Sequence, residues 1–212
     1  MGLSGRTIVL AGATSAAGLA VAQALLAGET RVIATGRSAE RLAALQDAGA
    51  ETQVADATSL TAMTDLAARL GVVDGVVPLV GGWRGGGGLA GQTDADFDAL
   101  LPALQAVRAT SRAFDSALRA SDAGRFAIVS SSAAARPLAG GANYAAVKAA
   151  SEAWARAVAQ GYAKAAREEE KPLRAASVII RVKSLDPGAL ASAIVGLWSE
   201  DAPALNDRVI DL

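Results

Sequence analysis

The stretch Thr-Ile-Val-Leu-Ala-Gly-Ala-Thr-Ser-Ala-Ala-Gly, residues 7–18, decides the fold. Its first four residues are β-branched or apolar, which predicts a short buried strand, and an alanine-rich helix is expected over 17–27. The residues between them are small, so the backbone can approach a bound pyrophosphate closely. The free N–H groups at the start of the helix would stabilise the charge of that group. The stretch therefore predicts a phosphate-binding turn, and the alternative is a tight turn that only packs helix on strand.

Short β-branched segments and longer alanine- and leucine-rich segments alternate along the chain. Strands are expected at residues 7–10, 31–35, 51–54, 75–79, 125–130, 174–180 and 208–211. Helices are expected at residues 17–27, 39–48, 60–70, 95–120, 143–169 and 187–198. Because the expected strands are apolar throughout, we predict a parallel sheet with helices on both faces. The fold class is therefore α/β, with residues 1–212 forming one domain around a single Rossmann-type doubly wound sheet of about seven strands.

The composition restricts the chemistry. The 212 residues include no cysteine and no histidine, and the formal net charge is −1. Thiol nucleophiles, histidine acid/base catalysis and the usual zinc sites are therefore excluded, and no metal is expected. The charge gives no reason to expect nucleic acid. The uncharged run 7–28 contains Gly, Thr, Ser and Gln, so we interpret it as strand, turn and helix rather than a membrane span, and we expect a cytoplasmic protein.

Tyr144 and Lys148 form the most informative pair for chemistry. Four residues apart on a helix, they lie on one face, where the ammonium can stabilise a phenolate and make the tyrosine a usable proton donor. The alternative is a solvated polar pair, because an alanine-rich chain produces this spacing by chance. A run of serines that includes Ser131 precedes the pair.

These motifs, in this order, resemble the short-chain dehydrogenase/reductase family. Gly12 and Gly18 match the first and last glycines of that family's Thr-Gly-x-x-x-Gly-x-Gly turn, in which Ala16 replaces the middle glycine. Ser131 lies at the family's usual spacing before Tyr144. The resemblance implies hydride transfer to a carbonyl carbon, with Tyr144 as general acid, Ser131 hydrogen-bonded to the same oxygen, and Lys148 bound to the nicotinamide ribose.

The resemblance implies a nicotinamide cofactor, and NADP(H) is favoured over NAD(H). Gly36 stands where an acidic residue would accept the ribose hydroxyls of NAD, and Arg37 offers a planar cation for a 2′-phosphate. The alternative is an exposed arginine that only opens the next helix. Asp56 matches the family's adenine-contacting aspartate, although it could instead cap the helix near Ser59. The expected cofactor contacts are Gly12, Thr14, Ser15, Ala16, Ala17, Gly18, Arg37, Asp56, Ala57, Gly81, Gly82, Tyr144 and Lys148.

The chain departs from the family pattern at two places. Leu104 stands where relatives carry a fourth catalytic residue, an asparagine, so Tyr144 must be reprotonated from solvent or through Lys148. Only residues 181–186 separate the sixth strand from the next helix, where relatives insert a substrate-covering loop. We therefore expect a shortened substrate loop and a site open on that side.

The glycine-rich segment 81–91 contains Trp83, and its Gly-Gly-Trp sequence resembles dihydropteridine reductases. Trp83 would then stack on a flat substrate. The alternative is that Trp83 only packs a glycine loop. Against a pteridine substrate stands Arg37, because those relatives carry an acidic residue at this point and use NADH.

The preferred prediction is an NADPH-dependent reductase of a small carbonyl or quinonoid compound. A dihydropteridine-reductase-like enzyme is one alternative, and a non-catalytic NADP(H)-binding redox sensor is another. The small apolar residues of 143–169, together with 95–120, resemble the helix pair through which the family forms dimers and tetramers, so a homodimer or homotetramer is expected. Alanine is also simply a good helix former, which is the alternative explanation.

Overall fold

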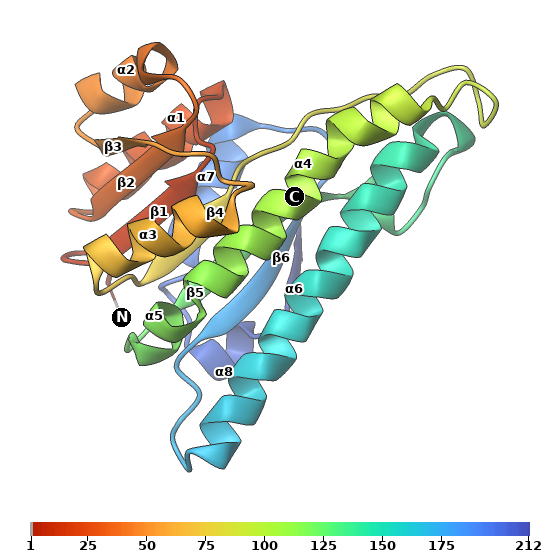
Figure 1. Cartoon of the computed structure of the whole chain (residues 1–212). Coiled ribbons are helices and arrows are strands. Elements are labelled where there is room, and N and C mark those ends of the chain that lie inside the picture. Colours follow the sequence, from red (N-terminus) through yellow and green to blue (C-terminus); the bar gives the residue numbers. More distant parts are fainter. Residues whose placement is uncertain (1) are drawn as a thin grey trace.

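The computed structural model describes residues 2–212 and contains a seven-stranded sheet in the order β3-β2-β1-β4-β5-β6-β7 (Figure 1). Every neighbouring pair of strands is parallel. The strands are β1 (Thr7–Ala11), β2 (Arg31–Gly36), β3 (Glu51–Val54), β4 (Gly75–Pro78), β5 (Arg125–Ser131), β6 (Ala176–Val182) and β7 (Val209–Asp211). The α-helices are α1 (Ala16–Ala27), α2 (Ala39–Asp47), α3 (Leu60–Leu70), α4 (Asp94–Ala113), α5 (Asp115–Ala120), α6 (Ala142–Glu168), α7 (Pro187–Gly196) and α8 (Ala202–Leu205). Two short 3-10 helices, η1 (Ser132–Ala134) and η2 (Ala139–Gly141), lie between β5 and α6.

The strand order reverses between β1 and β4, which are neighbours in the sheet although two strands separate them along the chain. A parallel sheet with this order is doubly wound, so the predicted fold class is confirmed. The reversal opens a crevice at the carboxyl ends of β1 and β4, where ligands of such sheets bind.

Side chains of β1 alternate between two hydrophobic cores. Ile8 and Leu10 face the core formed with α1, α2 and α7, whereas Val9 and Ala11 face the core formed with α3, α4 and α6. All four side chains are fully buried. Helices therefore cover both faces of the sheet, and α4 and α6 run side by side over the second face (Figure 1). This double burial explains why the central strands are apolar throughout.

The sequence predictions about elements need correction at four places. The helix expected over 95–120 is divided into α4 and α5, because the chain turns at Phe114, whose side chain is fully buried in the core. β6 begins at Ala176 instead of residue 174, and α8 was not expected. β3 is mostly exposed, because it lies at the edge of the sheet. None of the helices formed by residues 2–212 combines the length and apolar character needed to cross a bilayer.

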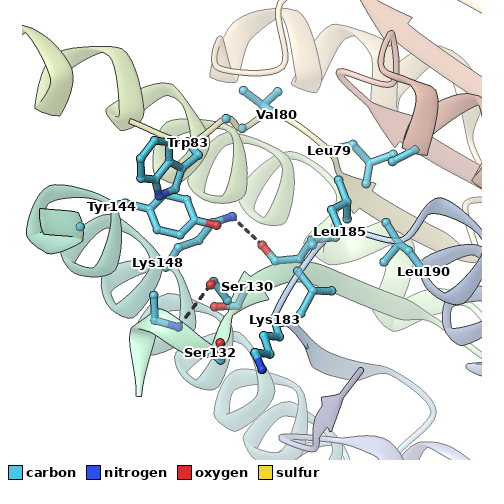
Figure 2. A pocket seen from close by; sticks show the side chains of 18 of the residues that line it. Leu79, Val80, Trp83, Ser130, Ser132, Tyr144, Lys148, Lys183, Leu185 and Leu190 are labelled. Atoms are coloured by element: carbon cyan, nitrogen blue, oxygen red, sulfur yellow. Dashed lines mark hydrogen bonds between the residues drawn. The ribbon is translucent and has the colours of Figure 1, made fainter. Parts of the chain in front are cut away.

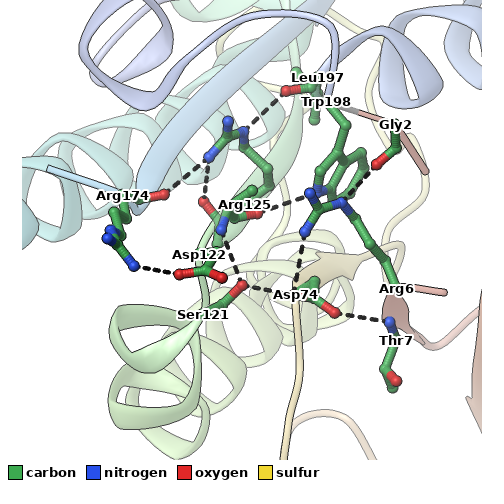
Figure 3. A network of polar contacts seen from close by, with 12 residues as sticks. Gly2, Arg6, Thr7, Asp74, Ser121, Asp122, Arg125, Arg174, Leu197 and Trp198 are labelled. Atoms are coloured by element: carbon green, nitrogen blue, oxygen red, sulfur yellow. Dashed lines mark hydrogen bonds and ion pairs between the residues drawn. The ribbon is translucent and has the colours of Figure 1, made fainter. Parts of the chain in front are cut away.

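A polar network ties the strands together at the amino ends of the sheet, opposite the crevice (Figure 3). The Asp74 carboxylate accepts hydrogen bonds from the Thr7 N–H, the Ser121 hydroxyl and the Arg6 guanidinium. The fully buried Arg125 guanidinium donates only to backbone carbonyls, those of Gly124, Arg174, Leu197 and Glu200. Burial lowers the pKa of Arg125 to about 10. The network holds the amino ends of β1, β4 and β5 together, and these strands carry the crevice at their carboxyl ends.

Candidate active site

Two adjoining cavities lie along the carboxyl edge of the sheet. The larger has a volume of about 1090 Å³ and contains Tyr144; we call it the tyrosine cavity. The smaller has a volume of about 510 Å³ and contains Arg37; we call it the arginine cavity. Both are lined by Ser15 and by residues 79–83, so they form one cleft across the crevice between β1 and β4.

The turn between β1 and α1 forms part of the cleft. Gly12 has a φ of 77°, and a Cβ there would collide with the side chain of Val80, so the turn requires glycine. The Ser15 hydroxyl accepts a hydrogen bond from the N–H of Gly18 at 3.1 Å and caps α1. The N–H of Leu19 already donates to the Ser15 carbonyl, whereas the N–H groups of Ala16 and Ala17, at the very start of α1, have no helical acceptor and can stabilise an anion.

The predicted cofactor residues do not all line the cleft. Ser15 and Ala17 line the tyrosine cavity, and Gly12, Thr14 and Ser15 line the arginine cavity. Ala16 and Gly18 line neither. Gly18 lies inside α1, where a Cβ would collide with the carbonyl of Ala13, so this glycine serves the close packing of helix on turn.

Arginines surround the arginine cavity. Arg37 and Arg41 are both exposed there, and within residues 2–212 neither takes part in an ion pair. Arg84 also lines it and lies 3.9 Å from Asp96. A Cβ at Gly36 would lie 2.6 Å from the Thr14 methyl group, so the acidic residue of NAD-specific enzymes has no room at this position without rearrangement. Arg41 was missed, although its place four residues after Arg37, in the first turn of α2, could have indicated it.

Asp56 and Ala57 lie at the floor of the arginine cavity. The Oδ1 atom of Asp56 accepts hydrogen bonds from the N–H and the hydroxyl of Thr58, at 2.9 and 2.8 Å. The N-cap of α3 is Ser59, whose hydroxyl accepts from the N–H of Ala62. The alternative that Asp56 caps this helix is therefore wrong, and Asp56 instead orders the turn before it.

Tyr144 and Lys148 lie one turn apart in α6, and both line the tyrosine cavity (Figure 2). The Lys148 Nζ atom lies 5.7 Å from the centre of the Tyr144 ring and donates a hydrogen bond to the Val129 carbonyl at 2.8 Å. Only 9% of Lys148 is exposed. Burial lowers the pKa of this ammonium to about 8, against the opposing effect of the Glu152 charge. Lys148 is thus a cation that can exchange a proton near neutral pH.

Ser131 ends β5 and is buried at the wall of the tyrosine cavity. Its Oγ accepts a hydrogen bond from the N–H of Ala133 at 3.2 Å, which fixes the side chain at the start of η1. Within residues 2–212 the hydroxyl proton has no acceptor, so it remains available to a ligand oxygen.

A buried carboxylate behind the cleft was missed. Glu152 accepts hydrogen bonds from the Ser130 hydroxyl at 2.7 Å and from two nitrogens of Arg181 at 2.7 and 2.6 Å, with Arg156 at 3.3 Å. Burial alone would raise the pKa of Glu152, but the hydrogen bonds and charges of these partners hold it below its ordinary value. Because Ser130 stands between Val129 and Ser131, Glu152 joins α6 to the strand end that holds the candidate catalytic residues. Its position one turn after Lys148 could have indicated it.

Trp83 lines both cavities and lies beside Tyr144 in the close view (Figure 2), with 62% of its surface exposed. Its glycine segment is held against η2: the N–H of Gly86 donates to the Gly140 carbonyl at 2.7 Å, and the Gln92 amide donates to the same carbonyl at 3.1 Å. Gly81 and Gly82 line both cavities. The loop is therefore ordered by its contacts with the segment before α6.

Leu104 packs in the same small apolar cluster as Tyr144, together with Leu100 and Val147. A leucine in this place supplies no hydrogen-bonding group for a proton relay. Within residues 2–212, no three Asp or Glu side chains gather as metal ligands.

A doubly wound sheet with a cleft across its strand-order reversal is typical of Rossmann-type nucleotide-binding proteins. The family model for short chain dehydrogenase matches residues 6–202. The chain belongs to the short-chain dehydrogenase/reductase family and is therefore an NAD(P)-dependent oxidoreductase. No curated protein matches its sequence.

Solved structures agree in fold. A short-chain type dehydrogenase/reductase from Mycobacterium ulcerans is 18% identical with a TM-score of 0.86, over 100% of this chain and 90% of that one. A short chain dehydrogenase/reductase family protein is 23% identical with a TM-score of 0.83, over 100% and 97% of the two chains. A metagenomic short-chain oxidoreductase in complex with NADP is 26% identical with a TM-score of 0.80, over 98% and 96%.

Proposed function

We propose that the chain is an NADPH-dependent reductase of a small carbonyl or quinonoid compound. The observation that carries the proposal is the meeting of Ser131, Tyr144 and Lys148 in the tyrosine cavity, next to a second cavity that contains Arg37 and Arg41. The cleft thus combines a proton donor, an anion-stabilising hydroxyl and two cations for a phosphate.

The donors along the cleft fit a dinucleotide phosphate. The start of α1 suits the pyrophosphate, Arg37 and Arg41 suit a 2′-phosphate, and Lys148 has two N–H groups left for ribose hydroxyls. The NADP complex of a relative that is 26% identical supports this choice. When bound, NADPH supplies the hydride, and the reaction balances as carbonyl plus NADPH plus a proton giving alcohol plus NADP⁺.

The protein's own residues handle the proton. As negative charge develops on the carbonyl oxygen, the Tyr144 hydroxyl donates its proton to that oxygen and Ser131 donates a hydrogen bond to it. The Lys148 ammonium lies close enough to the Tyr144 ring to stabilise the phenolate that remains. Because Leu104 offers no relay, Tyr144 regains its proton from solvent or from Lys148.

The test is NADPH oxidation across a panel of aldehydes, ketones and quinones. Tyr144→Phe should lower kcat by a factor on the order of 10² to 10⁴, as expected when a general acid is lost, and should change the NADPH Kd far less than kcat. Turnover that survives in Tyr144→Phe would sink the mechanism. Cofactor binding without turnover of any compound would instead favour a non-catalytic redox sensor.

Trp83 favours a second candidate, a dihydropteridine-reductase-like activity. A large exposed indole that lines both cavities could stack on a flat pterin. Trp83→Ala should then raise KM for quinonoid dihydropterin far more than for simple ketones. Equal changes for both substrates would count against this candidate.

We also propose that the enzyme is a homodimer or homotetramer. α6 leaves a row of exposed small side chains on the surface next to α4: Ala146, Ala149, Ala150, Ala153 and Ala157. A second copy could approach these short side chains closely.

A further inference from the structure

The charges that line the tyrosine cavity are all of one sign. Its wall contains Lys148, Arg136 and Lys183, and it contains no aspartate or glutamate. Lys148 belongs to the catalytic set. The side chains of Arg136 and Lys183 are exposed, and within residues 2–212 neither forms an ion pair. Two cations at the mouth of this cavity therefore have no partner of their own.

The position of Lys183 separates it from the phosphate-binding turn. Ser131 pairs with Val182 in the sheet, so Lys183 leaves β6 at the level of Ser132. In the close view its side chain extends toward Ser132 and away from Leu79 and Leu190 (Figure 2). Leu190 belongs to α7, which packs against α1. The side of the cavity near Leu190 is therefore the side next to the phosphate-binding turn.

Arg136 lines the same cavity, and like Lys183 it lies next to η1: Lys183 leaves β6 at the level of Ser132, the first residue of η1, and Arg136 comes two residues after the last. It belongs to the segment between η1 and η2, and η1 itself begins directly after Ser131. The arginine cavity already holds two cations for a 2′-phosphate, and the start of α1 serves a pyrophosphate. Arg136 and Lys183 are thus available to bind the substrate that is reduced at Tyr144.

The rim of the tyrosine cavity is apolar as well as cationic. Trp83, Leu138 and Leu185 line it, and 62%, 78% and 53% of their surfaces are exposed. They are among the few large hydrophobic side chains that remain exposed, and such clusters mark binding surfaces. A ligand that matches this rim has an apolar body.

We propose that the substrate is a carbonyl compound with an apolar body and an anionic group, a carboxylate or a phosphate, held by Arg136 and Lys183. The proposal rests on the reductase function proposed above and names its substrate class. The Arg136 guanidinium can hold either anion through two parallel hydrogen bonds, and Lys183 adds a second charge. Because the charged side chains that line the tyrosine cavity are all cations, the field there also concentrates anions near the reacting group.

The test compares matched aldehydes with NADPH as reductant. One pair is 4-carboxybenzaldehyde and methyl 4-formylbenzoate, and the other is 4-formylphenyl phosphate and 4-methoxybenzaldehyde. Because the ester activates its aldehyde more than the carboxylate does, the quantity that matters is the change in the anion-to-neutral ratio of kcat/KM on substitution. Arg136→Gln with Lys183→Gln should lower that ratio by about 10-fold, which is the combined effect of two exposed charge contacts, because kcat/KM should fall far more for the anionic than for the neutral substrates.

Two controls accompany this comparison. Lys164→Gln removes an exposed lysine elsewhere on α6 and should leave the ratio unchanged. In the wild type, the ratio should fall as salt is raised, because exposed charges are screened. If the double variant has a lower ratio than the wild type for the carboxylate pair, the substrate is a carboxylic acid. If the ratio is lower for the phosphate pair, the substrate is phosphorylated. Either result supports the proposal.

Unchanged ratios in the double variant would overturn the proposal. A loss of NADPH affinity with unchanged ratios would also overturn it, and would assign the cations to the cofactor. If no aldehyde turns over, the reductase function fails separately, and calorimetric binding of 4-carboxybenzaldehyde in the presence of NADP⁺ decides the inference. Binding should then weaken in the double variant but not in Lys164→Gln, and equal binding to all three proteins would refute it.

Discussion

Replacing Arg37 and Arg41 by alanine should change the cofactor preference of the enzyme. Both side chains line the arginine cavity, both are exposed, and neither has an ion-pair partner within residues 2–212. They are therefore free to bind a 2′-phosphate, which NADPH carries and NADH lacks. The substitutions should weaken NADPH binding and leave NADH binding as it is.

The magnitude follows from the exposure of the two arginines. A hydrogen bond to a charged group contributes about 1.5–3 kcal/mol when it is shielded, and an exposed ion pair contributes about 1 kcal/mol or less. A value of about 1.4 kcal/mol per arginine gives about 10-fold in Kd for each single variant. The double variant should lose somewhat less than about 100-fold, because neighbouring cations that share one phosphate are not independent.

Titration of nucleotide fluorescence measures both dissociation constants. Arg112→Ala, at an exposed arginine on α4 outside both cavities, serves as the matched control and should change neither constant. Added salt should reduce the NADPH preference of the wild type but not of the double variant. If NADPH and NADH affinities fall by the same factor, or if neither changes, the assignment of a 2′-phosphate site to the arginine cavity is refuted.

Three further predictions concern the ammonium, the buried carboxylate and the oligomer. The pKa of Lys148 is about 8 in the folded chain against an ordinary value of 10.5, so the unfolded chain holds this proton more tightly. The free energy of unfolding should therefore rise between about pH 8 and pH 10.5, by about 3 kcal/mol more in the wild type than in Lys148→Met. The same pH dependence of the unfolding free energy in both proteins would contradict this. Glu152→Gln should destabilise the fold by about 3 kcal/mol, because Arg181 loses a buried partner. It should also shift the alkaline limb of the pH–activity profile to lower pH, because Lys148 loses a nearby negative charge. Glu168→Gln, at an exposed glutamate, should have neither effect. Ala153→Arg should convert the oligomer to monomers in light scattering whereas Ala120→Arg on α5 should not, and a wild type that is monomeric at every concentration would remove this proposal.

The sequence predicted the parts of the fold that local pattern determines. The strand, turn and helix of residues 7–27 follow from apolar residues and small residues, and the structure confirms all three elements. The division of the expected helix 95–120 at Phe114 was not predictable in this way. Neither glycine nor proline marks that position; the chain turns where the buried phenyl ring packs against a distant part of the core.

The candidate site shows the same limit. Tyr144 and Lys148 were recognised because their spacing on one helix carries the chemistry. Glu152 was missed because its meaning depends on Ser130 and Arg181, which only the folded sheet brings to it. The contact between Gly86 and Gly140 joins distant segments, and no local pattern predicts it.

A crystal structure of the enzyme with NADP⁺ tests the central claim most directly. The account predicts nicotinamide density in the tyrosine cavity against Tyr144 and Lys148, and 2′-phosphate density in the arginine cavity against Arg37 and Arg41. Nicotinamide density away from Tyr144, or Lys148 without contact to the ribose, would contradict the assignment of these residues as the catalytic set.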